Sequence, residues 1–161
     1  MMRKILSVNN TANTTDLALF IARAGIAALM LIHGIPKLLM LFSGAPVQFP
    51  PVMGMSAELS LSLAVFAEVF CSVFILAGFA TRVATVPLII LMLVAVFVIH
   101  VADPFAKQEP ALYYLLVYVV LLVAGSGKYS IDYLLQSKGS TANYSAKKIQ
   151  ETTLAYLSTK N

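Results

Sequence analysis

The chain has 161 residues, of which 60% are hydrophobic and only 11% charged, with a formal net charge of +4. Soluble domains carry about 25% charged residues, and a small soluble fold leaves too much surface in water to hide so large an apolar fraction. The composition therefore excludes an ordinary soluble domain. It predicts an integral membrane protein whose partner is the lipid bilayer, with no nucleic-acid partner. The single cysteine, Cys71, cannot form a disulfide within the chain.

Four apolar runs are long enough, or nearly so, to cross a bilayer core, which takes about 20 helical residues. They lie at residues 17–37, 59–79, 83–101 and 111–125. They lack the alternation of barrel strands, and backbone groups in lipid must be bonded within their own helix. The sequence predicts an all-α, four-helix membrane domain over residues 1–135. A polar tail at 136–161 follows, for which a short helix after Ser145 and disorder are equal alternatives.

The distribution of basic residues predicts the orientation of this domain. Eight lie on one side of the four runs: Arg3, Lys4, Arg82, Lys128, Lys138, Lys147, Lys148 and Lys160. The other side has Lys37 and Lys107. By the positive-inside bias, both ends of the chain are expected in the cytoplasm, with Arg82 as a topology anchor. We expect a multi-pass protein of the inner (cytoplasmic) membrane.

Charged residues also occur inside the apolar runs. Arg23 lies in the first run and Glu68 in the second, and each costs several kcal/mol if it is left unpaired in lipid. Their predicted depths differ by about 8 Å at 1.5 Å per residue. We therefore expect Arg23 and Glu68 to form a buried pair.

Further polar residues gather at the outer ends of the runs. His33 and Lys37 close the first run and His100 closes the third. Because these two helices run in the same direction, both histidines are expected at one level, near Glu109 of the next loop. Together with Glu68, these residues are candidates for a ligand-binding pocket that handles protons or binds oxygen atoms.

Each of these features also has a purely structural interpretation. The Arg23–Glu68 pair would then lock helix packing, and the histidines would turn their polar edges to interfacial water. Two histidines could also hold a b-type haem or a metal. The sequence has no haem or metal motif, however, and we assign no metal ligands and no catalytic residue.

The ordered set of these motifs resembles the DoxX family of small four-helix bacterial membrane proteins, over about residues 16–135. The set comprises HGIPK at 33–37, Glu68, GFATR at 78–82, His100, Glu109 and GSGKYSID at 125–132. The resemblance implies that Gly125, Gly127, Ser130 and Asp132 form the turn that ends the fourth helix. Glycines can release a helix, and Asp132 can accept hydrogen bonds from freed amides or meet Arg82.

The resemblance implies an accessory subunit of a membrane redox system that involves quinone, thiosulfate or oxidative stress. Its partners would be membrane or periplasmic redox proteins, and a quinone is the cofactor that would fit the polar pocket. The alternative is a non-catalytic membrane scaffold that recruits a partner protein. Catalysis by this chain and its assembly into a homo-oligomer both stay open at this point.

Overall fold

The computed structural model describes residues 12–137 and residue 148, and the described part contains helices and no strands. The helical elements are α2 (Ala12–Phe42), α3 (Ala57–Val65), η1 (Phe66–Cys71), α4 (Ser72–Ala77), α5 (Thr81–Val94), η2 (Ala95–Ile99) and α6 (Phe105–Ala124). They make four continuous segments that are long and apolar enough to cross a membrane. This confirms the predicted all-α membrane fold. The proposed helix after Ser145 lies outside the described residues, apart from Lys148.

The first spanning helix is longer than the sequence indicated. The predicted segment was 17–37, whereas α2 runs from Ala12 to Phe42 and contains Pro36. Proline removes one helical hydrogen bond and usually ends or kinks a helix. In lipid the neighbouring backbone groups have no water to bond instead, so continuing the helix is the better outcome. The second and third spans each contain a π-helical stretch, η1 and η2.

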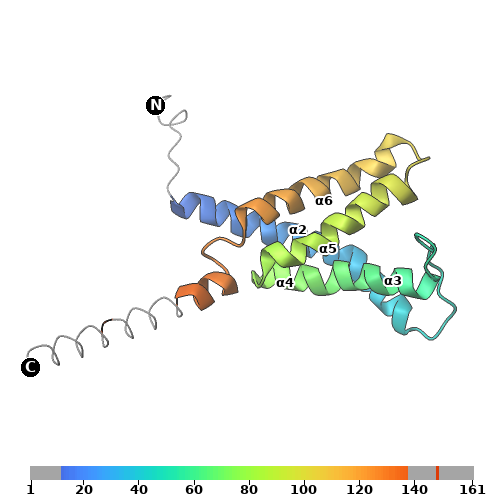
Figure 1. Cartoon of the computed structure of the whole chain (residues 1–161), viewed down its shortest axis with the longest axis horizontal. Helices are drawn as coiled ribbons and strands as arrows, with labels where there is room; N and C mark the ends of the chain where they lie inside the picture. Colours follow the sequence, from blue (N-terminus) through green and yellow to red (C-terminus); the bar gives the residue numbers. More distant parts are fainter. Residues whose placement is uncertain (1–11, 138–147, 149–161) are drawn as a thin grey trace, which may run out of the picture.

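The spans form two helical hairpins. One consists of α2 with α3, η1 and α4, and the other of α5, η2 and α6. We call the end that carries residues 78–81 and 125–130 the turn end, and the end that carries residues 43–56 and 100–104 the loop end. Figure 1 shows that α5 and α6 diverge from α3 toward the loop end. The hairpins are thus joined mainly at the turn end and in the middle.

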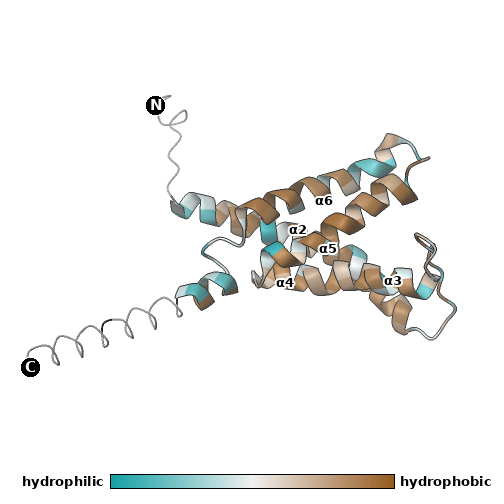
Figure 2. Cartoon of the chain, in the orientation of Figure 1, coloured by the Kyte–Doolittle hydropathy of each residue, from teal (hydrophilic) through white to brown (hydrophobic). Residues whose placement is uncertain are grey.

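The core is narrow and takes side chains from every span. Its fully buried members include Ala27 of α2, Ile75 of α4, Leu88 of α5 and Leu121 of α6. Many large apolar side chains point outward instead, and apolar residues cover the helices along most of their length (Figure 2). This outer surface is the one that contacts lipid.

The loop between α2 and α3 is held against α3 by hydrogen bonds. Val52 is buried, and its backbone N–H donates to Ser60 Oγ at 3.1 Å. Ser56 caps the start of α3 by accepting from the N–H of Leu59. The loop therefore lies against the start of α3.

One face of α2 packs against the second span, and Gly34 is its closest contact. A Cβ on Gly34 would lie 2.8 Å from Val69 Cγ2 and 3.0 Å from Glu68 Cβ. Gly25, on an exposed part of α2, would meet nothing within 4 Å. Small residues at such positions let helix backbones approach in a membrane.

We expect Gly34→Ala to destabilise the protein by about 1–3 kcal/mol, because the added methyl group overpacks the contact with η1. Gly25→Ala is the matched control, and should be neutral or stabilising by up to about 1 kcal/mol because alanine favours helices. Thermal unfolding in detergent measures both. Equal effects of the two changes would show that Gly34 does not set the distance between these helices.

Candidate functional site

The buried Glu68 carboxylate pairs with Lys37. Lys37 Nζ donates to Glu68 Oε1, and the two side chains are 29% and 5% exposed, respectively. Gly34, one turn before Lys37, touches the backbone of Glu68. The ion pair thus joins α2 to η1 inside the membrane-spanning region.

The predicted Arg23–Glu68 pair is wrong. Arg23 lies beside Gly78, ten residues after Glu68 in the second span, which corresponds to about 15 Å along a helix. The prediction failed because it counted each depth from its own helix end, as if the two ends were level. Instead, α2 begins eleven residues before Arg23, and Arg23 lies beside Gly78, where α4 ends. Both charges are buried, as expected, but each has a different partner.

Three further residues of the site were not predicted: Ser72, Tyr114 and Tyr118. The His33 ring packs edge-to-face on Tyr114, with centroids 5.9 Å apart, and Tyr114 stacks on Tyr118 at 6.2 Å. The signal that could have found the tyrosines is their spacing, since side chains four apart share a helix face. We call His33, Lys37, Glu68, Ser72, Tyr114 and Tyr118 the intramembrane site.

Several groups of the intramembrane site retain unused hydrogen-bonding capacity. Glu68 Oε2 is buried and has no hydrogen-bond partner within the described part of the chain. The buried Tyr118 hydroxyl and Ser72 Oγ are close enough to interact with each other and have no other partner there. Buried polar groups almost always have partners, so such exceptions need an explanation. Glu68 also lies in the π-helical stretch, a feature that is frequent at functional sites. Cys71 is buried in the apolar core, as a packing residue would be.

His100 and Glu109 make local contacts at the loop end instead. His100 Nδ1 lies 2.8 Å from Asp103 Oδ2, and Lys107 Nζ donates to Asp103 Oδ1 at 3.1 Å. These contacts, the His100 hydrogen bond first, lower the pKa of the Asp103 carboxyl from its ordinary value. Glu109 accepts from the Tyr113 hydroxyl. Among residues 12–137 and 148, no three His, Cys, Asp or Glu side chains gather as a metal site.

At the turn end, Arg23 connects three segments. Its side chain is buried, and Nη2 donates to the backbone carbonyl of Tyr129. Cζ lies 5.7 Å from the centroid of the Phe20 ring. Gly78 ends α4 with a φ of +70°, and a side chain there would collide with the guanidinium. Arg23 therefore holds α2, the end of α4 and the segment after α6 together.

The residues after α6 form the turn that the resemblance implied. Gly125 and Gly127 both have positive φ, at +82° and +69°. Ser130 Oγ accepts from the N–H of Tyr133 and caps a short helix over 131–137. The chain thereby turns back under the bundle.

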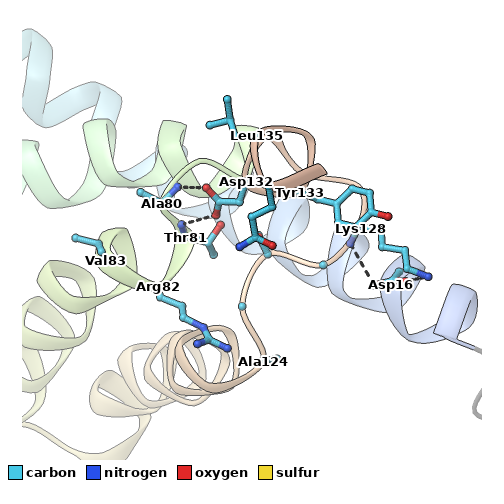
Figure 3. A pocket seen from close by; sticks show the side chains of 14 residues that line it. Asp16, Ala80, Thr81, Arg82, Val83, Ala124, Lys128, Asp132, Tyr133 and Leu135 are labelled. Carbon is cyan, nitrogen blue, oxygen red and sulfur yellow. Dashed lines mark hydrogen bonds and ion pairs between the residues drawn. The ribbon is translucent and has the colours of Figure 1, made fainter. Parts of the chain in front are cut away.

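Asp132 and Arg82 lie close to this turn but do not pair with each other. Asp132 accepts from the backbone N–H groups of Ala80 at 2.8 Å and Thr81 at 3.3 Å (Figure 3). Arg82 donates to the carbonyl of Val123 at 3.0 Å. Of the two roles left open for Asp132, the structure thus shows acceptance of hydrogen bonds from free backbone amides. These amides belong to the start of α5.

Comparison with known families assigns the chain to one of them. The DoxX family model matches residues 18–101, more than half of the 161-residue chain. The chain belongs to the DoxX family. The match includes HGIPK, Glu68, GFATR and His100, whereas the turn at 125–132 lies beyond it. No curated protein and no solved structure matches the chain.

We expect Lys37→Met to destabilise this DoxX protein by about 2 kcal/mol, because it strands a buried carboxylate. The double change Lys37→Met with Glu68→Gln should recover much of the loss. A double-mutant cycle by thermal unfolding measures the coupling. The same cycle between Arg23→Leu and Glu68→Gln is the control and should be additive. Coupling there, with none for Lys37, would contradict the assigned pair.

Asp132→Ala should cost about 1–2 kcal/mol, because two N–H groups at the start of α5 lose their acceptor. Asp132→Asn retains one acceptor oxygen and should cost less. Unfolding of both variants in detergent tests this order. A stability of Asp132→Ala equal to that of wild type would show that the cap does not hold α5.

Proposed function

We propose that this DoxX protein is an accessory subunit of an inner-membrane redox system and that the intramembrane site binds a quinone head group. The observation that supports the proposal is the Lys37–Glu68 pair within the spanning helices, next to buried polar groups with unused hydrogen-bonding capacity. Ionisable residues at such depth are costly and are commonly functional. A lipid-soluble ligand with polar oxygens suits this combination.

The proposed chemistry uses the donors and acceptors of the site. Lys37 Nζ and the Tyr118 hydroxyl donate to the carbonyl oxygens of the quinone. Reduction of a quinone to a quinol takes two electrons and two protons. The electrons come from a partner redox protein, and the two protons reach the quinone oxygens from water, through the exposed His33 imidazole and the Lys37 ammonium.

Access to the site from the lipid also supports a quinone. His33 is exposed, and Lys37 is partly exposed while Glu68 lies behind it. The ring of Phe49, from the loop before α3, has its centroid 5.9 Å from Lys37 Nζ. An aromatic ring above a partly exposed ammonium gives an apolar approach to a polar group. His100 and Glu109 lie outside this proposed site.

The test is the binding of a short-chain benzoquinone to the detergent-purified protein. We expect saturable binding by wild type and at least about tenfold weaker binding by Lys37→Gln, since a hydrogen bond to a charged group contributes about 1.5–3 kcal/mol. His100→Ala is the control and should bind as wild type does. An absorption spectrum of the same sample would reveal a haem.

Two results would reject the proposal. Wild-type protein without saturable binding would favour the non-catalytic scaffold, and the search would turn to partner proteins. An equal loss of quinone binding in Lys37→Gln and His100→Ala would show that the quinone does not bind at the intramembrane site.

A further inference from the structure

A pocket of about 630 Å³ lies at the turn end, separate from the intramembrane site. It is lined by the start of α5, the end of α6, the turn that follows and the helix over 131–137, with Asp16 of α2 beside them (Figure 3). Its size is in the range of small-molecule sites, about 300–1,000 Å³. We propose that this pocket binds a phosphate group, with Arg82 as the main contact.

The carboxylates of the pocket already have donors of their own. Asp132 accepts from two backbone N–H groups of α5. Asp16 accepts from the backbone N–H of Lys128 at 3.1 Å and pairs with its ammonium at 3.3 Å. Neither carboxylate depends on Arg82 as a partner.

Arg82 is the cation that remains available. In the part of the chain that the structure describes, its hydrogen bond goes to the neutral carbonyl of Val123, and it forms no ion pair there. Its side chain is exposed. The pocket thus presents a guanidinium that no described carboxylate neutralises directly.

The groups around Arg82 suit a phosphate. A guanidinium is a planar fork that binds phosphate oxygens in pairs. Gly125 leaves room beside it, since a Cβ there would lie 3.2 Å from Arg82 Nε. Thr81 also lines the pocket. It is fully buried, so it forms part of the pocket wall and leaves Arg82 as the contact for a phosphate.

The place of the pocket makes a phospholipid the local source of that phosphate. The spans α4 and α6 end here and α5 begins here, so the pocket lies where the hydrocarbon core meets the headgroups. Val83, Tyr133 and Leu135 line it and are exposed, and they can contact acyl chains and the interface. Free inorganic phosphate has the same chemistry and is the other source to test.

The experiment compares two lipids on the full-length chain in detergent by native mass spectrometry. Dioleoylphosphatidylglycerol has the phosphate, and dioleoylglycerol has the same acyl chains without it. We expect wild type to bind the phospholipid at least about tenfold more tightly. Arg82→Gln should weaken phospholipid binding about tenfold, as loss of a charge-assisted contact implies. Lys107→Gln, at the loop end, is the matched control and should bind as wild type.

Competition with millimolar inorganic phosphate distinguishes the sources. Displacement of the phospholipid would assign the pocket to free phosphate, and retention would assign it to a lipid headgroup. Equal affinity for the two lipids, or no loss in Arg82→Gln, would overturn the proposal. If Arg82→Gln does not fold, Arg82→Lys decides the matter, because it retains the positive charge but lacks the planar fork that binds phosphate oxygens in pairs. Unchanged binding by that variant would then overturn the proposal.

Discussion

The buried guanidinium of Arg23 is the constraint on which the rest of the structure depends. A charge buried in the protein must find acceptors there, because an unpaired buried charge is very costly. In the described chain its acceptor is the carbonyl of Tyr129. That carbonyl reaches Arg23 only because the segment after α6 turns back under the bundle and Gly78 has no side chain to obstruct the guanidinium. One charge thereby fixes the ends of α4 and α6 relative to α2.

This arrangement makes the two ends of the bundle different. At the turn end, Asp132 bonds the start of α5 to the segment that Arg23 holds, so both hairpins are fastened there. Toward the loop end the hairpins diverge (Figure 1), and the fixed point on that side is the Lys37–Glu68 pair between α2 and η1. The closed end thus supports the fold, while the polar groups with unused hydrogen-bonding capacity near Glu68 are buried between the spans.

The two charged contacts of α2 show which features of the structure the sequence could predict and which it could not. That Arg23 and Glu68 would be buried followed from their places in apolar runs. Their pairing did not, because it depends on how α2 is shifted along the second span. Arg23 lies beside Gly78, about 15 Å along the helix from Glu68, which is farther than a salt bridge reaches. His100 seemed to belong with His33 because the first span was expected to end at residue 37. In the structure α2 continues to Phe42, nine residues beyond His33, and His100 contacts Asp103 in its own loop.

The sequence by itself determined the membrane class, the four spans and the charged residues that are buried within them. These features follow from the length of a bilayer-crossing helix and from the cost of burying a charge, which can both be evaluated within one segment of the chain. Only the tertiary structure decided which charge meets which partner, added Ser72, Tyr114 and Tyr118 to the intramembrane site, and formed a pocket around Arg82. These features depend on the relative depth and rotation of helices that are distant in the chain. Both are set by side-chain packing, which no local pattern contains.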